Sequence, residues 1–178
     1  MVLVGAAGSG KSTFLRHLVG CLAIDRLLKQ AEEHSIESPL KERVQAWLDD
    51  APELTGLTPI FFQAREFGEW LQVEYADHGP EKAAPVFIWE YLRKQLKDQG
   101  LENAQEDLVA EAEQGTTILI VDGLDEVQEA HQTLTRAALS AWLDRYPSGQ
   151  VLMSCRKSAF QHSRIWHSLN LEQVLVKK

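Results

Sequence analysis

One short segment near the amino end has the residue types and spacing of a phosphate-binding loop. It reads G-A-A-G-S-G-K-S and matches the pattern G-x-x-x-x-G-K-[ST]. Glycines let successive backbone N–H groups turn toward a polyphosphate, and a following helix adds the positive end of its dipole. Lys11 can then reach the outer phosphates, and the Ser12 hydroxyl can ligate Mg²⁺. The residues expected to bind the nucleotide are Gly5, Ala6, Ala7, Gly8, Ser9, Gly10, Lys11, Ser12 and Thr13.

A second motif supplies an acid where a metal would need one. The run Ile118-Leu119-Ile120-Val121-Asp122 is an apolar strand that ends in an aspartate, which is the Walker B form. Such an aspartate, at the carboxyl end of a parallel strand beside the phosphate loop, can hold Mg²⁺ through water. Alone, Asp122 is also compatible with a turn or a helix N-cap, and the loop with a glycine-rich turn that binds nothing. Together the two motifs predict a magnesium site made by Ser12 and Asp122.

The elements that must position these motifs alternate along the chain. Apolar runs predict strands, and helical spacing of apolar residues with capping signals predicts the helices between them. We expect strands at 2–4, 58–64, 117–121, 151–153 and 174–176, and helices at 11–30, 39–48 (with Ser38 as N-cap), 85–98, 103–114 and around 134–142. The segment 67–84 is a loop or short helix, and 161–170 is undecided. Strands separated by helices imply right-handed crossovers and a three-layer α/β sheet.

Composition narrows the class of protein. The chain has 178 residues, which fits one domain, and its formal charge is −8, from 18 basic and 26 acidic residues. An acidic chain is not drawn in bulk to nucleic acid or anionic lipid, and no run approaches the about 20 apolar residues of a membrane span. Its two cysteines have no metal-site or C-x-x-C spacing, which favours a reducing compartment, so we expect a cytoplasmic protein. Because the first strand begins at the first residues, we expect a single nucleotide-binding core from a larger multidomain protein.

Three segments carry a family resemblance. Val121-Asp122-Gly123-Leu124-Asp125-Glu126 resembles the NACHT signature, an aspartate followed by a small residue and then two acids. Pro59 to Phe67 is similar to the second strand of that family, and Ser154-Cys155-Arg156 is similar to its sensor 1 position. The family belongs to the STAND class of signal-transducing P-loop ATPases. The resemblance implies an ASCE-type P-loop core that binds ATP or ADP with Mg²⁺, switches with nucleotide state and forms homo-oligomers.

Two departures from the family bear on catalysis. The residue after Asp122, a catalytic glutamate in many P-loop ATPases, is Gly123, so the base must be Glu126, our first choice, or Asp125. The alternative is that both acids only cap a helix. The usual proline after the sensor arginine is Lys157. Arg156 is expected to contact the γ-phosphate, or else to be a solvated loop residue.

Three functions remain open at this stage. The first is a slow Mg²⁺-dependent ATPase core of a NACHT-type switch. The second is a nucleotide-binding oligomerisation module with little or no hydrolysis, and the third is a small-molecule P-loop kinase. Adenine is favoured over guanine because no [NT]-K-x-D motif follows the third strand. Arg136 and Arg145 are nominal candidates for an arginine finger given to a neighbouring protomer.

Overall fold

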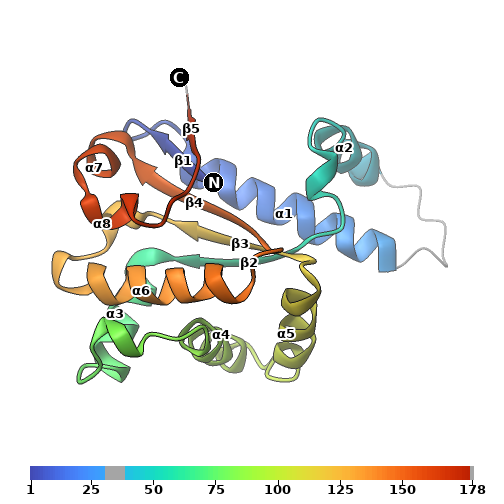
Figure 1. Ribbon diagram of the computed structural model, residues 1–178. Coiled ribbons are helices and arrows are strands. Elements are labelled where there is room, and N and C mark those ends of the chain that lie inside the picture. Colours follow the sequence, from blue (N-terminus) through green and yellow to red (C-terminus); the bar gives the residue numbers. More distant parts are fainter. Residues whose placement is uncertain (31–38, 177–178) are drawn as a thin grey trace.

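Five apolar segments form one parallel sheet. The computed structural model describes residues 1–30 and 39–176. The strands are β1 (Val2–Gly5), β2 (Thr58–Gln63), β3 (Thr117–Asp122), β4 (Gln150–Arg156) and β5 (Gln173–Leu175), in the spatial order β2-β3-β4-β1-β5. All four pairings are parallel, so the carboxyl ends of the strands lie along one edge of the sheet (Figure 1).

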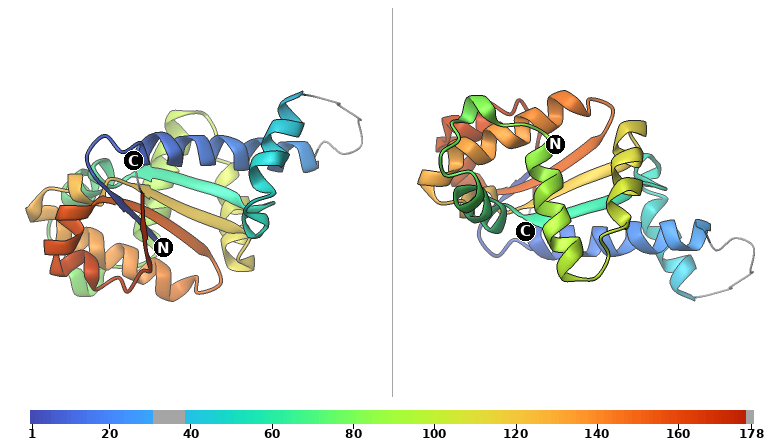
Figure 2. Two further views of the ribbon diagram at one scale, coloured as in Figure 1. Left: turned by 90° about the horizontal axis from the view of Figure 1, so that it is seen from above. Right: turned by 90° about the horizontal axis from the view of Figure 1, so that it is seen from below.

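Helices cover both faces of the sheet, which gives the three layers expected. On one face α1 (Lys11–Gln30) crosses the strands and α2 (Pro39–Leu48) packs beside it (Figures 1 and 2). The other face carries α3 (Ala64–Glu74), α4 (Val86–Asp98), α5 (Ala104–Gln114) and α6 (Glu129–Arg145). The short helices α7 (Lys157–His162) and α8 (Arg164–His167) follow β4. Single 3-10 turns occur at Pro52–Leu54, Pro80–Lys82 and Leu124–Glu126.

The sheet divides the core into two apolar clusters, because successive strand side chains point to opposite faces. Leu119 and Val121 of β3 pack with Trp142 of α6 in the larger cluster. Ile118 and Ile120 pack with the α1 leucines in the smaller one. All six residues of β3 are buried, as predicted for a central parallel strand.

The described strands and helices agree with the predicted order, with shifted ends. β2 stops one residue early, β5 begins and ends one residue early, and β4 continues three residues further, to Arg156. Gly115 ends α5 in the left-handed conformation, as expected of a helix C-cap. The N-cap expected at Ser38 lies outside the described residues.

The segment 67–84, expected to be a loop or a short helix, contains the larger part of α3, which ends at Glu74, followed by turns and the 3-10 turn Pro80–Lys82. The buried face of α3 is formed by Ala64, Phe67, Gly68 and Leu71, which follow an i, i+3, i+4, i+7 pattern. The pattern begins at Ala64, within the run 58–64 that predicts a strand, and it contains a glycine, which usually indicates a break in a helix. Gly68 is needed for close packing, since a Cβ there would lie 3.0 Å from the Thr135 Oγ1 atom of α6. None of the helices in the described ranges has both the length and the apolar character to cross a membrane.

Candidate functional site

The carboxyl ends of β1, β3 and β4 meet at one cavity. In open α/β sheets this edge is where ligands bind. The cavity measures about 270 Å³ and receives residues from the loops that follow all three strands. Its lining comprises Ala7 to Thr13, Asp122, Gly123, Asp125, Glu126, Ser154 and Arg156. Most of the residues predicted from sequence therefore lie together. Gly5 and Ala6 are not part of the lining.

The loop before α1 and the first turn of that helix line this cavity. Gly8 and Gly10 have φ values of 68° and 85°, a left-handed conformation that side chains disfavour. The first N–H to bond within the helical turn is that of Phe14, which donates to the Gly10 carbonyl at 2.8 Å. The N–H groups of Lys11, Ser12 and Thr13 precede it and have no intrahelical acceptor. A helix N-terminus of this kind favours an anion, and the first turn of α1 contains no acid.

Within residues 1–30 and 39–176, the buried ammonium of Lys11 contacts neutral oxygens. Its side chain is largely enclosed, with 9% of the residue exposed. Its Nζ donates to the Ala6 carbonyl at 2.9 Å and to the Gly5 carbonyl at 3.2 Å, and it lies 3.4 Å from the Ser9 hydroxyl. No salt bridge among the described residues includes Lys11. Burying a charge without a counter-ion is unfavourable, so an anion beside Lys11 would be strongly stabilised.

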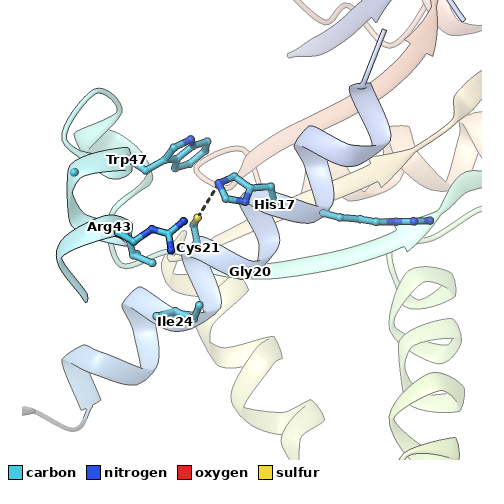
Figure 3. A pocket seen from close by; sticks show the side chains of 9 residues that line it. His17, Gly20, Cys21, Ile24, Arg43 and Trp47 are labelled. Carbon is cyan, nitrogen blue, oxygen red and sulfur yellow. Dashed lines mark hydrogen bonds between the residues drawn. The ribbon is translucent and has the colours of Figure 1, made fainter. Parts of the chain in front are cut away.

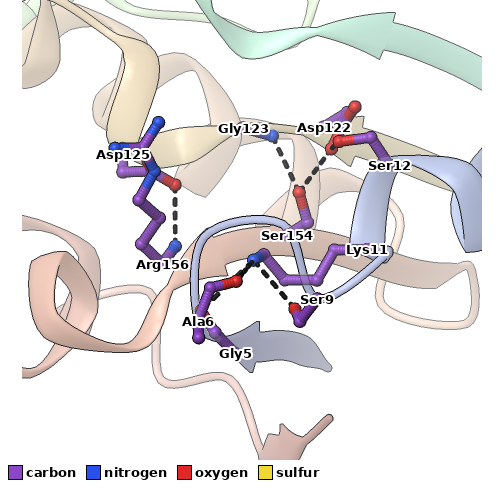
Figure 4. Close-up of polar contacts among 10 residues, drawn as sticks. All are labelled: Gly5, Ala6, Ser9, Lys11, Ser12, Asp122, Gly123, Asp125, Ser154 and Arg156. Atoms are coloured by element: carbon purple, nitrogen blue, oxygen red, sulfur yellow. Dashed lines mark hydrogen bonds and ion pairs between the residues drawn. The ribbon is translucent and has the colours of Figure 1, made fainter. Parts of the chain in front are cut away.

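Asp122 lies directly beside Ser12, and their side chains are hydrogen-bonded (Figure 4). Its residue is 7% exposed, and its Oδ1 accepts hydrogen bonds from Ser12 Oγ at 3.1 Å and from Ser154 Oγ at 2.5 Å. The Ser154 hydroxyl in turn accepts the Gly123 N–H at 2.9 Å. Ser154 therefore fixes both the Asp122 carboxylate and the backbone that follows it.

The Ser12 hydroxyl and the Asp122 carboxylate fit Mg²⁺ as part of a ligand set that a phosphate completes. A hydroxyl and a carboxylate are hard oxygen ligands, and Mg²⁺ is usually held by one or two carboxylates, waters and substrate phosphates. No cluster of three or more His, Cys, Asp or Glu side chains suited to a metal occurs in residues 1–30 and 39–176. The residues present therefore suit a metal that arrives with a phosphate ligand, and not a metal enclosed by protein groups alone.

Ser154 is a site residue that the motifs do not predict by themselves. It belongs to the segment Ser154-Cys155-Arg156, which resembles the NACHT family. The β4–β1 register places it beside Leu3, and the two-residue alternation of β4 turns it toward the face that α1 covers. The alternation of side-chain direction along β4, counted back from its end at Arg156, is the sequence signal that could have identified Ser154.

Gly123 has a backbone that explains why no glutamate stands there. Its φ is 79°, and a Cβ at this position would lie 3.1 Å from Glu126 Cδ and 3.3 Å from Glu126 Oε2. The Glu126 carboxylate thus lies over Gly123, in the space toward which a side chain at 123 would point. The 3-10 turn that begins at Leu124 holds this arrangement, with the Glu126 N–H donating to the Gly123 carbonyl at 2.9 Å.

Asp125 and Arg156 are bound to each other. The Asp125 Oδ1 accepts the Arg156 backbone N–H at 2.7 Å, and its Oδ2 lies 3.0 Å from Arg156 Nε. The Asp125 side chain is 7% exposed, whereas the Arg156 side chain is 54% exposed at the mouth of the cavity. Both Asp125 oxygens are therefore engaged with the end of β4.

The neighbouring thiol is structural. Cys155 is fully buried on the opposite face of β4, and burial together with the negative charge of Asp125 raises the pKa of its thiol to about 12. A thiol with such a pKa remains protonated at neutral pH and is a poor nucleophile.

The arginines considered as fingers do not line the cavity. Arg136 Nη1 lies 3.4 Å from the Ser140 hydroxyl, and Arg145 pairs with Glu113 at 2.8 Å.

Searches of family models, characterised proteins and solved structures found nothing that matches this chain.

Proposed function

We propose that this chain binds a nucleoside triphosphate with Mg²⁺ and hydrolyses it slowly, as the core of a NACHT-type signalling switch. One observation carries the proposal. A glycine-rich loop at a helix N-terminus and a strand-end aspartate line the same cavity, and Ser12 Oγ and Asp122 Oδ1 lie 3.1 Å apart. These are the two halves that phosphoryl-transfer sites of this type require.

The loop and Lys11 bind the phosphates in this proposal. The N–H groups of residues 11–13 donate to phosphate oxygens, and Lys11 exchanges its carbonyl partners for the outer phosphates. Ser12 and Asp122 hold the Mg²⁺, which would neutralise phosphate charge as a Lewis acid. Ser154 keeps the Asp122 carboxylate oriented, as outer partners of metal ligands commonly do.

Glu126 is the residue we assign to orient the attacking water. It lines the cavity, it is exposed at its rim, and none of the salt bridges among the described residues includes it. Asp125 is less suited to this role because both of its oxygens bind Arg156. We assign γ-phosphate sensing to Arg156 because it lines the mouth of the same cavity.

The strand order and the sequence motifs support the assignment to an ATP-binding core of the ASCE type that forms oligomers. β4 lies between β1, which precedes the loop, and β3, which ends in Asp122. This strand order is compatible with the ASCE-type core that the NACHT resemblance implies. ATP is preferred because the guanine-reading motif is absent from the sequence. The NACHT resemblance supports homo-oligomer formation that depends on the bound nucleotide.

A second candidate is a nucleotide-binding oligomerisation module that barely hydrolyses. The observation that favours it is the left-handed φ of Gly123, which disfavours a glutamate at the usual catalytic position. Glu126→Gln separates the two functions. A slow ATPase loses about 100-fold or more in single-turnover hydrolysis while it still binds ATP. A binding module shows the same residual rate in both proteins.

Calorimetric titration with ATP and Mg²⁺ tests the binding itself. Lys11→Ala is expected to abolish binding, because it removes the buried ammonium from the cavity. Lys41→Ala is the matched control, since Lys41 is an exposed lysine of α2 outside this cavity. Equal affinity in the wild type and Lys11→Ala would remove the loop from the proposal.

A further inference from the structure

Two side chains at the end of β4 anchor the segment that follows β3. Residues 154 and 156 are two positions apart, so their side chains point to the same side of the strand. The Ser154 hydroxyl accepts the Gly123 N–H at 2.9 Å. Arg156 binds Asp125, as Figure 4 shows. The end of β4 is therefore joined by two bridges to the segment that contains the 3-10 turn Leu124–Glu126.

The Asp125 carboxylate is the buried member of its ion pair. Its side chain is 7% exposed, and the salt bridges within residues 1–30 and 39–176 give it one cationic partner, Arg156. The neighbouring Cys155 thiol is neutral and cannot replace that partner. Removing one member of a buried pair is strongly unfavourable, because it leaves the other charge uncompensated. Arg156 is therefore held in place although more than half of its own side chain is exposed.

The contact with Asp125 leaves part of the guanidinium for another anion. Asp125 Oδ2 lies 3.0 Å from Arg156 Nε, and Asp125 Oδ1 accepts the backbone N–H of the same arginine at 2.7 Å. A guanidinium carries five N–H donors in one plane, four of them on the two Nη atoms. A carboxylate at Nε leaves donors at the far end of that plane, and Arg156 lines the cavity at the carboxyl ends of the strands.

We propose that Asp125 is a positioning residue, which holds the Arg156 guanidinium at the mouth of this cavity so that its remaining N–H donors bind the γ-phosphate of a nucleoside triphosphate. The assignment rests on the proposed function and extends it to the discrimination between ATP and ADP, because ADP has no γ-phosphate. Glu126 follows Asp125 in the same 3-10 turn. The γ-phosphate contact and the carboxylate assigned to the attacking water are thus tied to one short turn.

The size of the effect follows from the order that Asp125 gives to a long side chain. An arginine that is free in solution must be ordered when it binds an anion, which lowers affinity by a factor of about 2 to 10. Arg156 is already ordered by its ion pair, so ATP binding does not include that cost. The opposite effect, competition of the carboxylate with the phosphate, is disfavoured because the buried Asp125 would lose its cationic partner.

Calorimetric titrations with ATP and with ADP, each in the presence of Mg²⁺, measure the discrimination as a ratio of two affinities. Asp125→Asn keeps the size of the side chain and an oxygen that can accept the Arg156 N–H, but it removes the charge. We expect the ATP/ADP affinity ratio to fall about 3- to 10-fold, mainly through weaker ATP binding. Arg156→Lys should lower the ratio similarly, because a single ammonium lacks the planar fork that contacts two anions at once.

A double-mutant cycle separates positioning from a merely structural role. In an Arg156→Gln background, Asp125→Asn should leave the ATP/ADP ratio unchanged, because Asp125 acts through Arg156. A structural role would instead weaken ATP and ADP alike in Asp125→Asn. The controls are Asp77→Asn, at an exposed turn outside this cavity, and Arg43→Gln, in the separate groove between α1 and α2 (Figure 3). Both should keep the wild-type ratio.

The outcomes also distinguish this inference from the proposed function. A ratio in Asp125→Asn equal to that of the wild type would overturn the positioning role, and a higher ratio would show that the carboxylate competes with the phosphate. If Asp125→Asn does not fold, the ratio in Arg156→Lys decides by the same criterion. A wild type that binds neither nucleotide would contradict the proposed function itself, and the positioning role with it.

Discussion

Replacing Ser154 by alanine removes one hydroxyl that two groups share in the cavity at the carboxyl ends of β1, β3 and β4. The Asp122 carboxylate loses a charged hydrogen bond of 2.5 Å, worth about 1.5–3 kcal/mol. The buried Gly123 N–H loses its acceptor at 2.9 Å, which costs about 1–3 kcal/mol. Because both bonds belong to one hydroxyl the two costs are not fully additive, and we expect Ser154→Ala to lower the free energy of unfolding by about 2–4 kcal/mol.

Urea unfolding followed by circular dichroism measures this loss. A second readout is the Mg²⁺ dependence of ATP binding, which should weaken about 10–100-fold, as when the outer partner of a metal ligand is removed. Ser158→Ala is the control, because Ser158 is exposed on α7 and its hydroxyl forms no hydrogen bond within the described residues. A change below about 0.5 kcal/mol together with unchanged Mg²⁺ dependence would refute the positioning role of Ser154.

Two further predictions concern residues that surround this bridge. Gly123→Ala should destabilise the fold by about 1–2 kcal/mol, because a φ of 79° is unfavourable for alanine. Thermal unfolding measures this loss. Gly20→Ala is the control and should stabilise the protein slightly, because Gly20 lies in α1 with open space beside it. A neutral effect of Gly123→Ala would mean that its backbone is not left-handed. Burial raises the pKa of Cys155 to about 12, so the folded state keeps a proton that the unfolded chain releases near pH 9. The stability that this thiol contributes is therefore complete below pH 9 and is lost as the pH rises toward 12. Between these pH values the free energy of unfolding of Cys155→Ala should fall less steeply than that of the wild type, by up to about 1.4 kcal/mol per pH unit. Parallel plots of the free energy of unfolding against pH would contradict the raised pKa of Cys155.

Local patterns were sufficient to predict much of this fold. The run of residues 117–121 has the continuous apolar character of a strand buried on both faces, and it is buried on both. Gly100 and Gly115 mark helix ends because both adopt positive φ, at 71° and 74°. Such signals act through the backbone of a few neighbouring residues, so they can be recognised without the tertiary structure.

The features that were missed depend on contacts between distant segments. The helical periodicity of α3 is hard to recognise because it includes Gly68, and a glycine in the sequence usually indicates a break. The reason for this glycine is the close approach of α3 to α6, which is not visible in the sequence. Ser154 becomes a site residue only because parallel pairing brings the end of β4 beside β3. The pairing of Asp125 with Arg156 likewise joins residues 31 positions apart, and it could not be predicted from either motif alone.

Crystals grown with Mg²⁺ and a non-hydrolysable ATP analogue test the central claim most directly. We expect the β- and γ-phosphates against the N–H groups of the loop before α1, with Lys11 turned onto them. The metal should lie between the Ser12 hydroxyl and Asp122. A nucleotide bound elsewhere, with Lys11 still on the Gly5 and Ala6 carbonyls, would contradict the account.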